Sequence, residues 1–310
     1  MKKIAFVFPG QGSQSVGMLD AWGDNPAVAD TLARAGQALG QDLAGLIASG
    51  PAEQLNLTTN TQPAMLAAGV AVYRAWIAAG GRRPDVVAGH SLGEYAALTA
   101  AGALALEDAV RLVRVRADAM QAAVPVGAGA MAAILGLDDD AVRAACAQAA
   151  QGEVVEAVNF NAPAQVVIAG HKAAVERACE VAKAAGAKRA VLLPVSAPFH
   201  SSLLEPAARV LADALAQAPV NAPEIPVINN VDVASPAEPA AIRDALVRQA
   251  WHPVRWVETI RVMKAQGVTH VVECGPGKVL NGLTKRIDGE LTGLAITDPA
   301  SLDAALAALA

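Results

Sequence analysis

A serine set between a predicted strand and a predicted helix constrains the fold of this chain more than any other feature. Residues 89–93 read GHSLG, which fits the GxSxG pattern. The segment DVVA at 85–88 predicts a short buried strand, and residues 94–100 predict the first turns of a helix. On such a turn the hydroxyl of Ser91 faces the space above the strand ends. The pattern therefore favours a nucleophilic serine over a Gly/Ser turn without function.

Two backbone segments are candidates for stabilising an oxyanion. The N–H of Leu92 lies at the start of the helix, where it can donate to developing negative charge. The loop PGQGSQ at 9–14 directly follows a predicted first strand. It is not a dinucleotide-binding fingerprint, because Ser15 stands where the third glycine is required. We interpret it as an oxyanion or substrate-shaping loop, with a plain tight turn as the alternative.

A serine nucleophile needs a base, and the chain has five histidines. His200 lies in the segment APFHSS at a predicted domain junction, where clefts usually form. It is the candidate base, although a lone histidine is often merely packed. The other four have structural or surface interpretations, His90 because its side chain is expected to point away from the serine: His90, His171, His252 and His270.

No Asp or Glu occupies an obvious third position for a catalytic triad. A carboxylate is not required there, because a backbone carbonyl can also accept from Nδ1 of the histidine. Three arginines share one predicted helix over 107–123: Arg111, Arg114 and Arg116. Any of them could bind a carboxylate through its guanidinium fork, and a solvated helix face is the expected environment of two of the three.

Strand-like apolar runs alternate with helical periodicity along most of the chain, which indicates an α/β fold. A Pro/Gly-rich stretch at 124–129 interrupts this pattern, and the order β-α-β-β-α-β of a ferredoxin-like unit follows. We therefore predict a small ferredoxin-like domain at 127–196. It is inserted into a large α/β-hydrolase-like domain with a mostly parallel sheet, formed by residues 1–126 and 197–310.

Three predicted elements lie close to the domain junction. They are a strand at 189–195, a helix over 202–218 and a strand at 226–230.

Composition excludes several classes of protein. Hydrophobic residues make up 54% of the 310 residues and the formal net charge is −5, which gives no electrostatic footprint for nucleic acid. No apolar stretch is long enough to predict a membrane span. Three widely spaced cysteines form no metal-binding pattern, and they are typical of reduced thiols in the cytoplasm.

Five motifs together give the chain a specific resemblance along almost its whole length. It resembles the malonyl-CoA:acyl carrier protein transacylases of bacterial type II fatty acid synthesis. The motifs are FPGQGSQ at 8–14, GHSLGE at 89–94, the RxR ending at Arg116, PFH at 198–200 and ECGPG at 273–277. The inserted ferredoxin-like domain is also what this resemblance implies.

The resemblance implies a role for each matching residue. Ser91 would be the nucleophile and His200 its base, oriented by the backbone carbonyl of Gln249. The N–H groups of Gln11 and Leu92 would form the oxyanion hole.

The acyl pocket follows from the same resemblance. Arg116 would pair with the malonyl carboxylate, and Asn159 would line the pocket. Phe199, next to the histidine, resembles the residue that malonyl-selective members have at this position. A bulky side chain there disfavours a branched acyl chain.

The implied reaction is a ping-pong transfer through a malonyl-serine ester, from malonyl-CoA to the phosphopantetheine thiol of an acyl carrier protein. It needs neither metal nor cofactor, and a cytoplasmic monomer is expected. Carrier proteins are generally acidic, so docking requires a local basic patch on this acidic chain. The candidates are Lys183, Lys188 and Arg189, or Lys285 and Arg286.

Other functions remain open on the sequence. A serine hydrolase or thioesterase would use the same serine and histidine with water as acceptor, but would have no evident use for Arg116. An acyltransferase that loads polyketide carrier proteins is a close alternative. A non-catalytic carrier-protein binder would predict a degraded set of site residues, and none of the matched residues is degraded.

Overall fold

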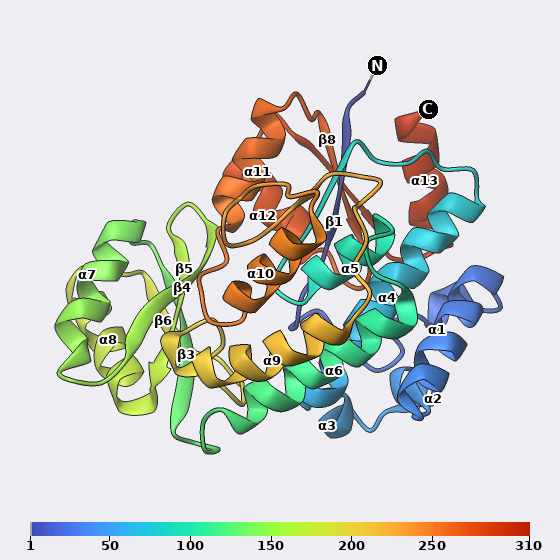
Figure 1. Ribbon diagram of the computed structural model, residues 1–310. Helices are drawn as coiled ribbons and strands as arrows, with labels where there is room; N and C mark the ends of the chain where they lie inside the picture. The colour runs from blue at the N-terminus through green and yellow to red at the C-terminus, as the bar shows by residue number, and fades with distance from the viewer. Residues whose placement is uncertain (1) are drawn as a thin grey trace.

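A computed structural model describes residues 2–310 and contains two β-sheets (Figure 1). The larger sheet has the strand order β7-β2-β1-β8-β9, and all its pairings are parallel. Its strands are β1 (Ile4–Phe8), β2 (Val86–Gly89), β7 (Val227–Ile228), β8 (His270–Cys274) and β9 (Thr292–Ile296). The mostly parallel sheet expected for the large unit is therefore present.

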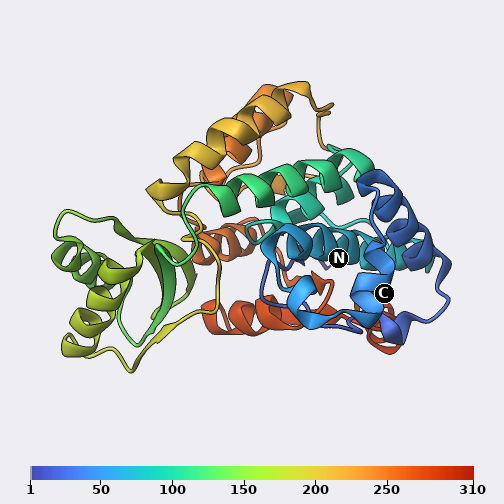
Figure 2. The same ribbon diagram turned by 90° about the horizontal axis from the view of Figure 1, so that it is seen from below.

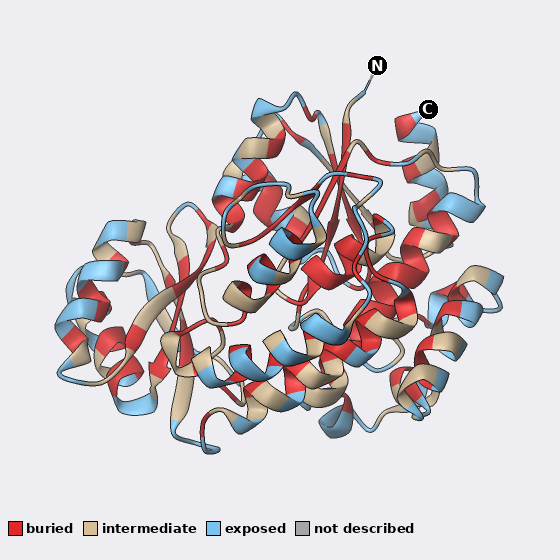
Figure 3. Cartoon of the chain, viewed as in Figure 1, coloured by how far each residue is buried: buried red, intermediate tan, exposed pale blue. Residues whose placement is uncertain are grey.

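The central strand β1 is buried along its whole length because both faces of the sheet are covered. Side chains alternate along a strand, so Ile4, Phe6 and Phe8 enter one hydrophobic core. Ala5 and Val7 enter a second core on the opposite face. Figure 3 shows the residues of this central strand as buried.

The helices fall into two groups according to the core they join. One core receives side chains from α1 (Pro26–Leu39), α2 (Leu43–Ser49), α3 (Ala52–Leu55), α4 (Thr58–Ala78), α5 (Gly93–Ala100), α6 (Leu106–Ala122), α9 (Glu205–Gln217), α10 (Pro239–Gln249) and α13 (Pro299–Leu309). The other receives them from α11 (Trp256–Ala265) and α12 (Val279–Ile287). Two short 3₁₀ helices are η1 (Asp20–Trp22) and η2 (Ser202–Leu204).

The second sheet forms a separate lobe (Figures 1 and 2). Its elements occur in the predicted order: β3 (Gly129–Leu135), α7 (Asp139–Ala150), β4 (Val155–Ala162), β5 (Gln165–His171), α8 (Lys172–Ala184) and β6 (Arg189–Leu192). The strands lie in the order β4-β5-β3-β6, which is that of a ferredoxin-like sheet, and all three pairings are antiparallel. The lobe lies inside the segment 127–196, and the exact division into domains stays a prediction.

The two faces of the small sheet have different roles. One face packs with α7 and α8 around a hydrophobic core of its own. The other face carries Met131, Val158 and Val167, which pack with Phe199 of the large unit. The small sheet therefore contributes one wall to whatever site lies between the two lobes.

Three elements near the junction are shorter than the sequence predicts. The strand expected at 226–230 is only β7, because the N–H groups of Asn229 and Asn230 leave the ladder and bond elsewhere. The strand expected at 189–195 ends at Leu192, and a tight turn joins Val195 to Leu193. The helix expected over 202–218 begins with η2 and becomes α-helical only at Glu205.

Among residues 2–310, no helix combines the length and the apolar character that crossing a membrane requires.

Candidate active site

The turn between β2 and α5 lifts Ser91 out of the sheet. Ser91 has a φ of 54°, in the left-handed region that non-glycine residues rarely adopt. Such strain persists only where the surroundings enforce it, and it is typical of functional turns. Gly93 permits the close packing, because a Cβ there would lie 2.2 Å from the main-chain oxygen of Phe8.

His200 contacts this serine directly. Its Nε2 lies 2.7 Å from Oγ of Ser91, and its Nδ1 lies 2.8 Å from the main-chain oxygen of Gln249. A carbonyl oxygen only accepts, so Nδ1 carries the proton and Nε2 is free to accept from the serine hydroxyl. The structure thus brings together the three residues that the sequence selected for nucleophile, base and orientation.

The environment keeps the imidazole of His200 neutral. Burial, followed by the positive charge of Arg116, lowers the pKa of His200 to about 3. The hydrogen bond to Gln249 acts in the opposite direction but is the smaller influence. A neutral imidazole is the form that can remove a proton from serine.

Arg116 on α6 lies beside the serine and is 3% exposed. Its Nη1 donates to Oε1 of Gln62 at 2.7 Å, and its Nη2 donates to Oε1 of Gln249 at 3.0 Å. Nη2 also lies 3.0 Å from Oγ of Ser91. Among residues 2–310, Arg116 has no carboxylate partner and its Nε has no acceptor. Burial disfavours the charged guanidinium and therefore lowers the pKa of Arg116. An anion bound here would supply the counter-charge that the described residues do not provide.

The two other arginines of this helix lie outside the site. Arg111 is exposed and bonds Asp108 and the main-chain oxygen of Ala38. Arg114 donates to the side chain of Gln41 at 2.5 Å. Arg111 thus has the solvated position expected for two of the three arginines, whereas Arg114 is half-buried and its Nε has no acceptor among residues 2–310.

The two N–H groups expected to face an oxyanion line the same cavity as Ser91. Leu92 follows the serine, and Gln11 belongs to the loop after β1. Within residues 2–310, neither N–H donates to a protein acceptor. The loop packs tightly on the turn, since a Cβ on Gly10 would lie 2.6 Å from the main-chain oxygen of His90. The side chain of Gln11 is held by Thr58, whose hydroxyl donates to it at 2.8 Å.

A buried polar network supports the serine turn from behind. Asn230 accepts from the N–H of Ser91 at 2.8 Å and donates to the oxygen of Gly89 at 2.7 Å. Glu94 accepts from the N–H of Asn230 at 2.9 Å and from Nε2 of Gln249 at 3.0 Å. Burial raises the pKa of Glu94 to about 7. The side chain of Gln249 therefore links Glu94 to Arg116, while its backbone orients the histidine.

The cavity around Ser91 has a volume of about 190 Å³. The small sheet contributes Met131, Asn159 and Val167 to its wall, and Phe199 contributes from the segment that carries His200. Asn159 is 6% exposed and bridges to Val254 through the backbone. The cavity thus lies between the two lobes and contains every residue that the sequence selected except Gln249, which lies directly behind it.

The remaining histidines do not contact the serine hydroxyl. His90 lines the cavity, but its Nε2 lies 2.7 Å from Oδ1 of Asn161. His171 accepts from the N–H of Val154, and His252 bonds the main-chain oxygen of Arg248. His270 opens β8 and bonds the neighbouring threonine.

The three cysteines are buried and unpaired. Within residues 2–310, no group of three His, Cys, Asp or Glu side chains is placed to hold a metal ion.

Sequence reasoning missed Gln62, Glu94 and Asn230. A signal existed for Glu94, a charged residue in an otherwise largely apolar helical segment. Gln62 ends a polar run at the start of α4, and nothing in that run distinguishes it. Asn230 follows a strand of only two residues, and nothing in the sequence connected it with a serine 139 positions away.

The sequence of the chain matches a known protein family along most of its length. The acyl transferase domain family matches residues 5–286. This chain belongs to that family. The acyltransferase is also 58% identical over 307 residues to the malonyl CoA-acyl carrier protein transacylase of Escherichia coli K12, and the alignment covers 99% of each chain.

Solved structures agree with the family assignment. The acyltransferase matches the acyl-carrier-protein S-malonyltransferase of Burkholderia pseudomallei with a TM-score of 0.97 at 68% identity, covering 98% of this chain and 99% of that one. A malonyl-transacylase solved in complex with its type II PKS acyl-carrier protein matches with a TM-score of 0.97 at 52% identity, covering 99% of both chains. The α/β fold with two sheets is therefore that of known malonyltransferases.

Proposed function

We propose that this acyltransferase moves the malonyl group from malonyl-CoA to the phosphopantetheine thiol of an acyl carrier protein. A relative that matches along 99% of both chains is named malonyl CoA-acyl carrier protein transacylase. A serine hydroxyl 2.7 Å from a neutral histidine is also suited to acyl transfer. The observation that supports malonyl as the acyl group is the position of Arg116. Its guanidinium is buried, lies 3.0 Å from the serine oxygen and has no carboxylate partner in residues 2–310. The carboxylate of a malonyl group would complete this pair.

In the first half-reaction, Ser91 attacks the thioester carbonyl and Nε2 of His200 accepts the hydroxyl proton. The carbonyl oxygen becomes an oxyanion, which the N–H groups of Gln11 and Leu92 stabilise. The C–S bond then breaks, CoA leaves with the proton from His200, and the malonyl-serine ester remains. Gln249 holds the imidazole in the required tautomer throughout.

Substrate binding also strengthens the base. Arg116 is the second-largest cause of the lowered pKa of His200. A malonyl carboxylate bound to Arg116 offsets that positive charge, so the pKa of His200 rises when the substrate is present. The histidine thus becomes a better proton acceptor only with the correct acyl group in place.

In the second half-reaction, the carrier-protein thiol attacks the ester and His200 accepts its proton. The serine leaves with that proton, and the free enzyme is restored. The product is a malonyl thioester on the carrier protein, which supplies fatty acid chain elongation.

Arg116 also gives the selectivity that separates this reaction from general ester hydrolysis. An acetyl group would occupy the cavity without pairing the buried guanidinium, which costs free energy. Phe199 and Asn159 line the cavity. The bulk of Phe199 disfavours a branched acyl chain. A general ester hydrolase has no evident use for a buried arginine that pairs with a substrate carboxylate. The site is therefore better interpreted as that of a transferase.

The intact mass of the protein after brief mixing with malonyl-CoA tests this proposal. The wild type gains a malonyl-sized adduct, Ser91→Ala gains none, and Arg116→Ala acylates at least tenfold more slowly because the carboxylate has lost its partner. Arg111→Ala is the matched control on the same helix and keeps the wild-type rate. Release of free CoA from an unmodified wild type would show that water is the acceptor and would reject the transferase.

The partner and setting complete the proposal. The acceptor is an acyl carrier protein, consistent with the complex solved for the 52% identical relative. Among the basic candidates for docking, Lys183 pairs with Glu180, and Arg286 bonds Gln165. Monomeric state and cytoplasmic location stay predictions.

A further inference from the structure

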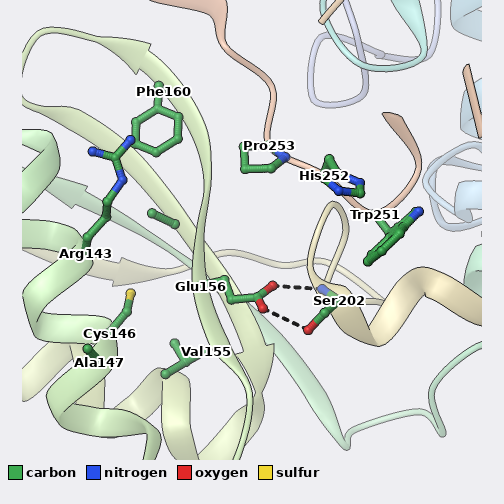
Figure 4. A pocket seen from close by; sticks show the side chains of 11 residues that line it. Arg143, Cys146, Ala147, Val155, Glu156, Phe160, Ser202, Trp251, His252 and Pro253 are labelled. Carbon is green, nitrogen blue, oxygen red and sulfur yellow. Dashed lines mark hydrogen bonds between the residues drawn. The ribbon is translucent and has the colours of Figure 1, made fainter. Parts of the chain in front are cut away.

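A carboxylate of the small sheet bonds the segment that carries the catalytic histidine. Oε2 of Glu156 on β4 accepts from the N–H of Ser202 at 2.8 Å, and Oε1 accepts from its hydroxyl at 2.8 Å. Figure 4 shows Glu156 pointing away from its strand toward Ser202. Both oxygens of one carboxylate are thus used on a single residue of the other lobe.

Ser202 follows His200 by two residues and begins η2. The segment is strained, because His200 has a φ of 65°. Ser201 bonds back to Pro198 within the same turn, and no side chain of the segment itself caps η2. Glu156 is therefore the contact from outside the turn that fixes its C-terminal end.

The same strand also fixes the segment that follows Gln249. Val254 donates its N–H to the oxygen of Val158 at 2.8 Å and accepts from the N–H of Phe160 at 3.0 Å. Strand β4 therefore binds both chain segments that meet at the imidazole: one carries the ring, and the other carries the carbonyl that orients it. Asn159, between those two residues, faces the cavity.

We propose that Glu156 is a positioning residue for the catalytic base. Its paired bonds to Ser202 fix the 198–202 turn, so that Nε2 of His200 stays 2.7 Å from Oγ of Ser91. Glu156 does not line the cavity around the serine, and it acts only through Ser202. The inference rests on the proposed function, because it assigns Glu156 to the same serine–histidine pair.

Glu156→Gln tests the role with little change in shape. The amide oxygen can accept from the N–H of Ser202 and the amide nitrogen can donate to its hydroxyl, but both bonds lose the charge of the carboxylate. Hydrogen bonds to a charged group are the stronger ones, so the contact weakens and the turn loosens. Displacement of a catalytic group by about 1 Å can cost about 100-fold in rate. We expect the rate constant of malonyl-serine formation to fall at least tenfold, while KM for malonyl-CoA stays within about twofold because Arg116 is untouched.

Three further variants make the result specific. Glu153→Gln is the matched control, since Glu153 pairs with Arg177 inside the small lobe at 2.7 Å and should keep the wild-type rate. Ser202→Thr retains both donors and should also keep it, whereas Ser202→Ala should lose part of it. The double variant Glu156→Gln with Ser202→Ala should lose less than the product of the two single losses, because both changes break the same contact.

The outcomes separate this inference from the proposed function. A wild type that forms no malonyl-serine overturns the proposed function. A wild type that forms it while Glu156→Gln acylates at the same rate overturns the inference alone. A slow Glu156→Gln whose thermal midpoint falls well below that of Glu153→Gln, or whose defect lies in KM, also overturns it, because the carboxylate then serves stability or binding rather than the base.

Discussion

At the scale of the residue, the site depends on buried polar groups whose partners are nearly complete. Gln249 illustrates this, since its main-chain oxygen orients His200 and its side chain joins Glu94, Ser91 and Arg116. Arg116 is the exception, with an unused Nε and no carboxylate partner among residues 2–310. A buried charge without a partner is costly to the folded protein, and in the proposed function the malonyl carboxylate relieves that cost.

The pH behaviour of His200 is a prediction at this scale. Its pKa of about 3 lies below the ordinary value, so the folded protein leaves the ring neutral while the unfolded chain protonates it below about pH 6.5. This histidine therefore makes the free energy of unfolding fall as pH falls from 6.5, by about 2 kcal/mol at pH 5. Nitrogen NMR of the labelled ring should show a neutral imidazole with the proton on Nδ1 at pH 5.

The variant His200→Asn serves as the control for this pH dependence. It identifies the resonance by its absence, and it should lose less stability than the wild type between pH 6.5 and pH 5. A His200 ring that titrates near pH 6.5 in the ligand-free protein would contradict the prediction.

At the scale of the element, the β2–α5 turn exists because small residues let three segments meet. The turn packs against the end of β1 at Gly93 and against the following loop at Gly10. Helix α5 begins at Gly93 with Leu92 as its N-cap residue, so the N–H of Leu92 lies at the start of the helix next to the serine. The strained φ of Ser91 follows from this packing.

Gly93→Ala tests the packing of the turn. A Cβ would lie 2.2 Å from the main-chain oxygen of Phe8, so backbone must move. We expect a loss of about 3 kcal/mol or more in the free energy of unfolding, measured by urea denaturation, together with loss of acylation. Gly282→Ala in α12 is the control, since nothing lies within 4 Å of its new Cβ. It should stabilise the protein by about 0.5–1 kcal/mol.

At the scale of the whole molecule, the candidate active site lies between a large parallel sheet and a small antiparallel one. Each has its own hydrophobic core, and the serine and histidine belong to the large unit. The small sheet supplies one wall of the cavity and, through β4, contacts both segments that meet at His200. Its position therefore shapes the pocket and, in the proposed role of Glu156, also the geometry at His200.

The separate core of the small unit predicts separate local stability. Ile168 on β5 is 1% exposed within that core, so Ile168→Ala should cost about 2–5 kcal/mol. Amide hydrogen exchange should accelerate within residues 129–192, while β1 keeps its protection. Val126→Ala, at a side chain 85% exposed, should change neither region. Equal acceleration throughout the chain would show one cooperative unit instead.

Local pattern alone was enough to predict the class of fold and much of the site. The GHSLG turn depends on a strand, two glycines and a helix that are contiguous in sequence, and such short-range constraints can be read from one chain. The order of elements in the small unit is likewise visible in the periodicity. The roles of His200, Gln249 and Arg116 came mainly from resemblance, because each is far from Ser91 along the chain.

Tertiary structure alone decided what surrounds these residues. Gln62, Asn230 and Glu94 join the site through contacts between distant segments, and no local pattern records such contacts. Strand β7 is short because the N–H of Asn230 bonds the side chain of Glu94. The segment before α9 starts as the 3₁₀ helix η2, where the N–H of Ser202 bonds the side chain of Glu156. The sequence determined which chemistry is present. Packing determined the distances, the burial and the charges that let this chemistry operate, because those quantities depend on the whole chain being folded.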